Sequence, residues 1–354
     1  MQRQTMQNAL SAPQVGGIVK LTRFIFLTSF AIEGIGALLL FPVFVPRYGL
    51  KGIWLSVFHS ISAFCNAGID ILGSDSLAKY ICNPLINITT MLLIILSGIG
   101  FSVWYDVLGN IKKIRKKEIP GKWWFTRLRL HSKLAIVTTL ILLAAGTLLT
   151  FLLEYHNPDT IGHLRFGDKW MASAFQSVTT RTAGYSTFSQ AGMHEETRFL
   201  NILLMFIGGS PMGTAGGVKT TTIAVLILSI AAYLQGKKDV EVYGRRIRES
   251  YLRSAMVVAG TSVLILFTMT VLLSAVMPGV DLADVLYEIT SAGATVGLSR
   301  GLTPQLNVAG KWIVILTMYL GRIGPLTLGT AVVMRVRNRP GSTTHLGEED
   351  IMIG

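Results

Sequence analysis

The sequence predicts an all-α, polytopic membrane protein built from three helix–loop–helix repeats. The first observation behind this prediction is composition: of 354 residues, 51% are hydrophobic and only 14% are charged, whereas a soluble globular chain carries roughly 25% charged residues. The second is that three short glycine-containing stretches recur at a nearly constant interval. The third is that basic residues gather beside the ends of apolar segments, as they do on the cytoplasmic side of membrane proteins.

The three glycine loops define the repeats. They read Phe64-Cys65-Asn66-Ala67-Gly68, Thr180-Arg181-Thr182-Ala183-Gly184-Tyr185 and Ala294-Thr295-Val296-Gly297-Leu298. Each follows a short helix-like run, over 54–64, 169–178 and 281–292, and the loop glycines recur after 116 and 113 residues. A fixed period with a fixed internal order indicates one structural unit used several times. Because cation filters are built from loops whose backbone carbonyls face a pore, we expect helix–pore-loop–helix repeats around a central pore.

Six apolar segments reach the length of about 20 residues that a bilayer requires. They lie at 22–45, 83–108, 134–154, 199–235, 255–277 and 309–334. Basic residues in 112–133, 237–253 and 335–339 assign those segments to the cytoplasm, so the loops between the paired spans face outward. The predicted division is a cytoplasmic connector 1–21, a repeat 22–111, a basic linker 112–133, a repeat 134–236, a basic linker 237–253, a repeat 254–335 and a tail 336–354. Both termini are then cytoplasmic.

Composition also argues against other classes of protein. The net charge of +13 lies at the ends of spans rather than on one binding face, so no nucleic-acid partner is expected. Two cysteines and scattered histidines predict neither a disulfide framework nor a metal centre. The spans hold no paired acids and no Ser–His pairing, so we expect no enzyme, no catalytic residue and no bound cofactor. Acids of the outward segments, among them Glu154, Asp281, Asp284 and Glu288, either concentrate cations near a pore or belong to an ordinary solvated surface.

The fourth span is nearly twice the necessary length and is interrupted in its middle. The interruption reads Gly208-Gly209-Ser210-Pro211-Met212-Gly213-Thr214-Ala215-Gly216-Gly217-Val218-Lys219. Glycine and proline break helices, so two half-helices joined by an irregular loop are expected at membrane depth. Such a loop needs a cavity around it, which favours a gate in the pore over a kink or a cytoplasmic extension. The gate candidates are Gly208, Gly209, Ser210, Gly213, Thr214, Gly216, Gly217 and Lys219. A phosphate-binding loop is excluded because Val218 precedes Lys219 where that motif needs glycine.

Arg322 is a charged residue in the middle of the last span. A charge at that depth costs roughly 2.5–3.5 kcal/mol on insertion scales, which makes it a functional candidate. Its neighbour Gly321 follows Gly297 by 24 residues, the same separation as that of Gly208 from Gly184. Two interpretations remain open: a fixed positive charge in the pore, or a structural partner of Glu33 or of clustered carbonyls.

Taken together, these residues resemble the Ktr/Trk/HKT superfamily of potassium transporters, and most closely the membrane subunits of bacterial Ktr systems. Besides the glycine loops and the broken span, the similar stretches are Phe58-His59-Ser60-Ile61-Ser62-Ala63-Phe64, Gly301-Leu302-Thr303-Pro304 and Gly321-Arg322-Ile323-Gly324-Pro325. The resemblance implies potassium uptake across the bacterial plasma (inner) membrane, through a filter whose carbonyls replace the hydration shell of the ion. The implied filter residues are Asn66, Ala67, Gly68, Thr182, Ala183, Gly184, Thr295, Val296 and Gly297. The implied gate is 208–217, and the implied pore arginine is Arg322.

The resemblance further implies a homodimer with one pore per subunit, seated on a cytosolic ring of nucleotide-binding regulatory subunits. Potassium is then the transported ion, and any nucleotide belongs to the partner. The family has four repeats, however, and this chain shows three, of which the first resembles the family's second. A truncated product, a partial chain, a partner that supplies the missing repeat and an inactive product all remain open. The alternatives to potassium uptake are a non-conducting scaffold or partner subunit and a sodium-conducting relative.

Overall fold

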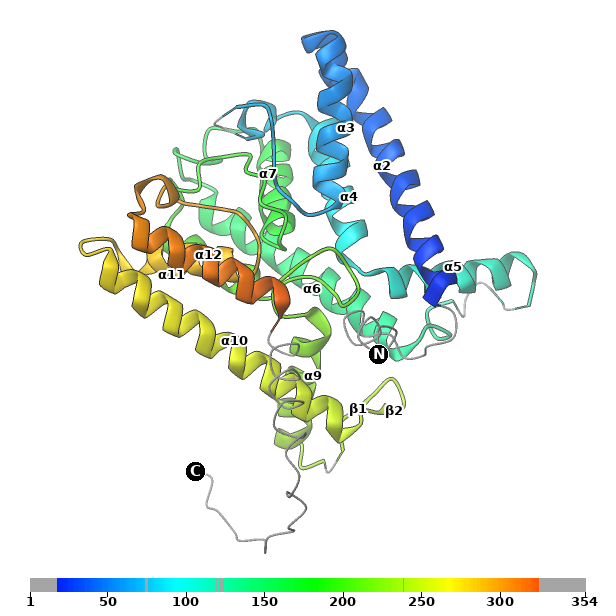
Figure 1. Cartoon of the computed structure of the whole chain (residues 1–354). Coiled ribbons are helices and arrows are strands. Elements are labelled where there is room, and N and C mark those ends of the chain that lie inside the picture. The colour runs from blue at the N-terminus through cyan, green and yellow to red at the C-terminus, as the bar shows by residue number, and fades with distance from the viewer. Residues whose placement is uncertain (1–17, 74–75, 119, 121–123, 238, 325–354) are drawn as a thin grey trace, which may run out of the picture.

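The computed structural model describes residues 18–73, 76–118, 120, 124–237 and 239–324. These residues are almost entirely helical, with one small hairpin (Figure 1). Most of the predicted connector 1–21, the whole tail 336–354 and the end of the sixth predicted span lie outside the described residues. The basic cluster at 335–339 also lies outside them.

The same three-part unit occurs three times along the chain. In the first unit α2 (Ile18–Tyr48) turns at Gly49 into α3 (Leu50–Phe64), and α4 (Pro84–Gly98) follows the loop. In the second, α6 (Leu130–Glu154), α7 (Phe166–Thr179) and α8 (Glu195–Phe206) play these parts. In the third they are α10 (Glu249–Val276), α11 (Leu282–Gly293) and α12 (Val308–Ile323). The three short helices expected before the glycine loops are therefore confirmed as α3, α7 and α11.

Three of the described helices are long and apolar enough to cross a membrane. They are the first helices of the three units: Leu21–Tyr48, Leu130–Glu154 and Glu249–Val276. Between 17% and 22% of their most apolar windows is buried within the chain, and large side chains such as Phe30, Leu140 and Phe267 are exposed. An apolar helix with so little burial in its own protein is suited to contact with lipid.

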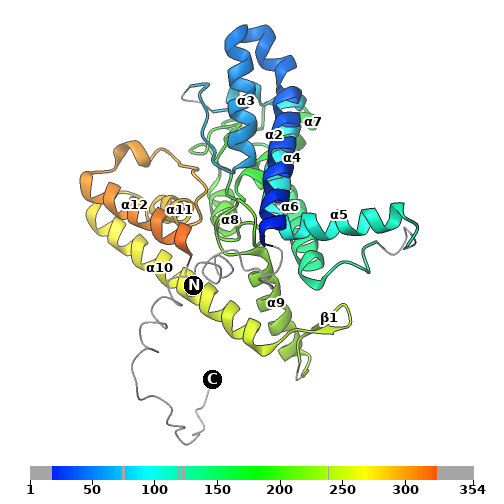
Figure 2. The same cartoon turned by 45° about the vertical axis from the view of Figure 1, so that its right-hand side comes forward.

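The second predicted span, 83–108, is not one helix, and this is a correction. The chain bends by 94° between α4 and α5 (Phe101–Arg115), and α5 projects away from the other helices in both views (Figures 1 and 2). Gly100, at φ 97°, occupies the turn in a conformation that residues with a Cβ rarely adopt. The last turn of α5 carries Lys112, Lys113 and Arg115.

The fourth predicted span is broken as its glycines and proline indicate. Helix α8 ends at Phe206 and α9 (Thr220–Leu234) begins after an irregular loop. The basic linker that follows contains a hairpin that the sequence did not predict, with β1 (Glu241–Val242) paired to β2 (Arg245–Arg246). The hairpin packs through Tyr243, whose ring lies 5.2 Å from Nζ of Lys133 at the start of α6. The hairpin and α9 lie at the end of the molecule opposite the α2–α3 turn (Figure 1).

Candidate ion filter and gate

The three glycine loops share one backbone conformation. In each loop a residue other than glycine has a positive φ: 50° at Asn66, 73° at Thr182 and 57° at Thr295. Two residues later the loop glycine is also in the left-handed region, at 63°, 90° and 95°. A positive φ is uncommon outside glycine, so its recurrence at the same position of all three loops identifies them as one structural unit.

The loop amides turn back onto the pore helices, while the loop carbonyls stay free. The amide of Ala67 donates to Ser62 O at 2.9 Å, that of Ala183 to Thr179 O at 2.9 Å, and that of Val296 to Ser291 O at 2.8 Å. Within the described residues, no hydrogen-bond donor pairs with the main-chain carbonyls of the nine candidate filter residues. Four of these residues, Asn66, Thr182, Ala183 and Val296, are buried, and buried carbonyls are normally paired. Unpaired carbonyls at corresponding positions of the three loops are available as ligands for a cation.

The glycine of each of the first two loops lies close to a carbonyl oxygen of the next loop. A Cβ placed on Gly68 would overlap the carbonyl oxygen of Ala183, and a Cβ on Gly184 would overlap that of Val296. On Gly297, by contrast, it would meet only the Cα of Gly184, at 3.8 Å. The first loop therefore packs on the second and the second on the third, and among the described residues the side next to Gly297 is open.

The loop over 207–219, which we call the gate loop, lies against all three filter loops. Thr214 donates its hydroxyl hydrogen to Phe64 O at 3.2 Å, and the amide of Gly216 donates to Oγ1 of Thr182 at 3.0 Å. Gly216 also leaves no room for a Cβ beside Thr295 Oγ1 and Ala294 O. The candidate gate residues are thus packed directly against the candidate filter.

The gate loop is closed at its neck by main-chain and side-chain hydrogen bonds. The amide of Gly208 donates to Val218 O at 2.9 Å, and Ile207 and Val218 form a parallel bridge. The hydroxyls of Ser210 and Thr220 lie 2.8 Å apart. Lys219, which is partly buried, donates from Nζ to Ala215 O at 2.7 Å. These contacts hold the two ends of the gate loop together.

The tip of the gate loop fills the bend between α4 and α5. The amide of Ser210 donates to Gly98 O at 2.8 Å, and the amide of Phe101 donates to Met212 O at 3.0 Å. A Cβ on Gly213 would come within 2.7 Å of Ser97 O. A bend in a span frees backbone groups that lipid cannot satisfy. Here the gate loop satisfies them, which explains why the second span breaks at this point.

Arg322 lies beside the gate loop, where Nη1 donates to Thr214 O at 3.3 Å. No ion pair joins Arg322 to Glu33 in the part of the chain that the structure describes. Of the two partners that the sequence left open, the structure shows a carbonyl. Arg322 is itself exposed, on the last described turns of α12.

Arg181 is a site residue that the sequence analysis did not single out. It lies in the second filter loop and is only 6% exposed, and its Nη2 donates to Gly208 O at 2.7 Å. The signal was present, because a charge within an apolar protein is a functional candidate. Arg181 stands in a short loop rather than in a long apolar span, where such a charge is most easily noticed.

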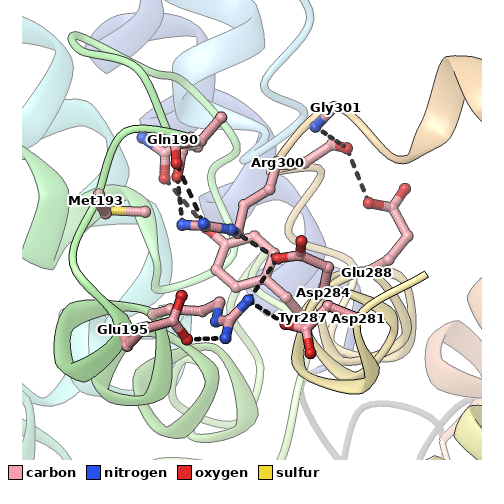
Figure 3. A network of polar contacts seen from close by, with 12 residues as sticks. Gln190, Met193, Glu195, Asp281, Asp284, Tyr287, Glu288, Arg300 and Gly301 are labelled. Atoms are coloured by element: carbon pink, nitrogen blue, oxygen red, sulfur yellow. Dashed lines mark hydrogen bonds and ion pairs between the residues drawn. The ribbon is translucent and has the colours of Figure 1, made fainter. Parts of the chain in front are cut away.

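Several acids of the outward segments form internal contacts: Glu154 and Glu288 are buried, whereas Asp281 is 55% exposed. Glu154 is fully buried and accepts hydrogen bonds from Asn157, Thr160 and the amide of His194. Figure 3 shows the larger network around Arg198 and Arg300. It consists of contacts of Arg198 with Glu195, Asp281 and Asp284, of Arg300 with Asp284 and Gln190, of Tyr287 with Gln190, and of Glu288 with Ser299 and Thr303. It ties α8 to α11 and to the segment that follows the third filter loop.

Comparisons with known proteins identify the family of this chain. Residues 1–339 match the family model described as "TrkH: Cation transport protein". The chain is 42% identical over 327 residues to "Ktr system potassium uptake protein B" of Bacillus subtilis, covering 92% of this chain and 70% of that protein. It is 36% identical over 358 residues to "Potassium/sodium uptake protein NtpJ" of Enterococcus hirae, covering 99% of this chain and 76% of the relative.

The crystal structure of the potassium transporter TrkH from Vibrio parahaemolyticus has the same fold, with a TM-score of 0.74 at 17% identity. The alignment covers 96% of this chain and 68% of that one. The predictions of an all-α membrane protein of several spans, and of a transporter rather than an enzyme, are confirmed. The chain belongs to the TrkH family of cation transport proteins.

Proposed function

We propose that this chain conducts potassium ions into a bacterial cell across the plasma membrane. The ion passes a filter formed by the carbonyls of residues 66–68, 182–184 and 295–297. The gate loop closes the path directly below the filter, and Arg322 places a positive charge beside it. The observation that carries this proposal is the ring contact, in which the loop glycines of the first two units each lie against a carbonyl of the next loop.

The open side next to Gly297 bears on how the pore is completed. Replacing a hydration shell requires oxygens on all sides of the ion. We therefore propose that a fourth loop, from a further repeat or a second polypeptide, fills the space beside Gly297. If no such loop exists, a non-conducting scaffold or partner subunit becomes the better interpretation.

A sodium-conducting protein is the second candidate, because one relative is named a potassium/sodium uptake protein. Both candidates use the same filter and differ only in which ion it prefers. The free carbonyls and loop glycines of the three filter loops are compatible with potassium.

For the assembly, we propose a homodimer on a cytosolic ring of nucleotide-binding regulatory subunits, with both termini in the cytoplasm. The support is the position of basic side chains on segments expected at the cytoplasmic face. Lys112, Lys113 and Arg115 end α5, and Arg245 and Arg246 lie in the hairpin. Acidic partner surfaces would meet complementary charge there, which steers association.

Uptake of rubidium and potassium by bacteria that lack their own potassium uptake systems tests the proposal. Cells expressing the chain should accumulate both ions against a background of sodium. Gly184→Ser should relax this preference, because the side chain would enter the space occupied by Val296 O. Gly34→Ser is the matched control, since Gly34 lies in α2 with no atom within 4 Å of its added Cβ. Equal sodium and potassium uptake by the unmodified chain supports the sodium candidate, and no flux supports the scaffold.

A further inference from the structure

Arg181 connects the second filter loop to the gate loop, and the proposed function does not use it. Its amide donates to Val178 O at 3.1 Å, at the end of pore helix α7. Its guanidinium donates from Nη2 to Gly208 O, at the entrance of the gate loop. Oγ1 of the next residue, Thr182, accepts a hydrogen bond from the amide of Gly216, near the end of that loop. Two adjacent filter residues therefore hold both sides of the gate-loop neck.

The guanidinium carries a charge that no acid balances. Among the described residues, no carboxylate lies within ion-pair distance of Arg181. Its Nη1 is buried and has no hydrogen-bond partner among the described residues. A buried charge is costly unless it is paired and hydrogen-bonded. The residue therefore needs both the Gly208 carbonyl and a further ligand.

A small cavity supplies the place for that ligand. It has a volume of about 10 Å³ and is lined by Ile94, Ile95, Gly98, Thr139, Leu143, Val178, Arg181 and Gly209. Thr139, on α6, is also buried, and among the described residues its hydroxyl has no hydrogen-bond partner. The two residues that carry these unpaired groups thus line one cavity. A cavity of roughly 10–15 Å³, expressed as space for a water centre, holds one water molecule.

We propose that Arg181 is a positioning residue that fixes the neck of the gate loop to the second filter loop. It does so directly through the Gly208 carbonyl, and a single water molecule joins its Nη1 to the hydroxyl of Thr139. While this contact holds the neck, the gate loop stays closed, and without it the loop opens more readily. The inference rests on the proposed role of the gate loop and adds which contact holds it closed.

The test measures rubidium flux and the preference for potassium over sodium in cells carrying the full chain. Arg181→Gln keeps an amide donor but removes the charge and the second nitrogen. We expect flux to rise roughly tenfold, the weight of one charge-assisted hydrogen bond, with ion preference unchanged. Arg181→Lys retains the charge, so its rubidium flux should lie between that of the unmodified chain and that of Arg181→Gln. A variant that changes ion preference but not flux would place the role in the filter and overturn the proposal.

Thr139→Val isolates the water contact without touching Arg181. It should raise flux about two- to threefold, in line with one neutral hydrogen bond. Thr150→Val is its matched control, because Thr150 is another buried, unpaired threonine on α6 that does not line the cavity. Equal effects of the two threonine variants would refute the bridging water. These variants also keep the proposal testable if Arg181→Gln fails to reach the membrane.

A chain that lacks residues 211–214 shows whether Arg181 acts through the gate loop. In that background the neck no longer controls a closing tip, so Arg181→Gln should add nothing to the flux. The same proportional increase in both backgrounds would mean that Arg181 acts elsewhere. Absence of flux from the unmodified chain would instead count against the proposed function itself.

Discussion

The main-chain amide of Gly216 donates a 3.0 Å hydrogen bond to the hydroxyl oxygen of Thr182. Gly216 belongs to the gate loop and Thr182 to the second filter loop, so this bond joins the two proposed functional parts directly, as the bond from Arg181 to Gly208 O also does. Both residues are buried. The second filter loop therefore supports the gate loop through direct hydrogen bonds.

Thr182→Ala should lower the thermal stability of the purified protein and raise rubidium flux. The loss leaves the buried amide of Gly216 without a partner, at a cost of about 1–3 kcal/mol. Backbone strain acts in the opposite direction, since a β-branched residue at φ 73° is disfavoured and alanine is less so. A net destabilisation in a melting experiment therefore reports the hydrogen bond. Thr182→Asn is the control, because Asn66 occupies the same position of the first loop.

Gly297→Ala tests what fills the open side of the ring. In the described chain the added Cβ would meet only Gly184 Cα. The substitution should therefore lower the free energy of unfolding only by the cost of alanine at a positive φ, about 1 kcal/mol. Gly68→Ala adds an overlap with Ala183 O and should abolish rubidium uptake. Equal loss of uptake in the two variants would show that a further loop packs on Gly297 in the working protein.

The sequence predicted the parts of the site that backbone chemistry specifies. Gly68, Gly184 and Gly297 are visible as a repeat because each stands at a positive φ, a conformation that favours glycine. The broken fourth span is visible because Gly and Pro interrupt an apolar run. Neither prediction needed knowledge of a tertiary partner. The fold class followed from the same features together with composition.

What the sequence did not predict depends on contacts between distant segments. Gly98 and Gly100 mark the bend after α4, but 83–108 is apolar enough to be one span, and the bend is stabilised by Ser210 and Met212 more than 100 residues later. The partner of Asp284 was hidden for the same reason, since Arg198 lies 86 residues away. Arg181 could have been noticed from its charge alone.

Gly100→Ala should open the contact between the bend and the gate loop. Its Cβ would overlap Pro211 O, and the residue would be strained at φ 97°. We expect a lower melting temperature and higher rubidium flux. Gly109→Ala, inside α5 with open space around it, should instead stabilise the protein by roughly 0.5–1 kcal/mol. The prediction is wrong if both variants shift the melting temperature in the same direction.

Asp284→Asn should destabilise the protein more than Asp281→Asn does. The Asp284 carboxylate contacts Arg198 at 2.9 Å and Arg300 at 2.8 Å, and these arginines are 7% and 9% exposed (Figure 3). Replacing Asp284 removes a negative charge that two nearly buried guanidinium groups share. The cost should fall between the roughly 1 kcal/mol of a surface pair and the roughly 3–5 kcal/mol of a buried one. Asp281 is 55% exposed and contacts Arg198 alone, so its loss should resemble a surface pair in a melting experiment.

Cys82 allows the proposed orientation to be read directly. It is exposed and lies just before α4, in a segment expected to face outward. In a Cys65→Ala background, a membrane-impermeant maleimide added to intact cells should label Cys82. A Lys113→Cys variant of a chain in which both native cysteines are replaced should react only after the cells are permeabilised. The opposite pattern would invert the proposed topology.

The pH dependence of this labelling checks the surroundings of Cys82. Partial burial, followed by the negative charge of Asp168, raises the pKa of the Cys82 thiol. The thiolate is the reactive form, so at neutral pH labelling should be slower than for an unperturbed cysteine. Its rate should still be rising at a pH where an ordinary thiol has levelled off. Asp168→Asn removes the negative charge, lowers the pKa of Cys82 and should speed the reaction at neutral pH. An unchanged rate in that variant would leave burial as the whole cause.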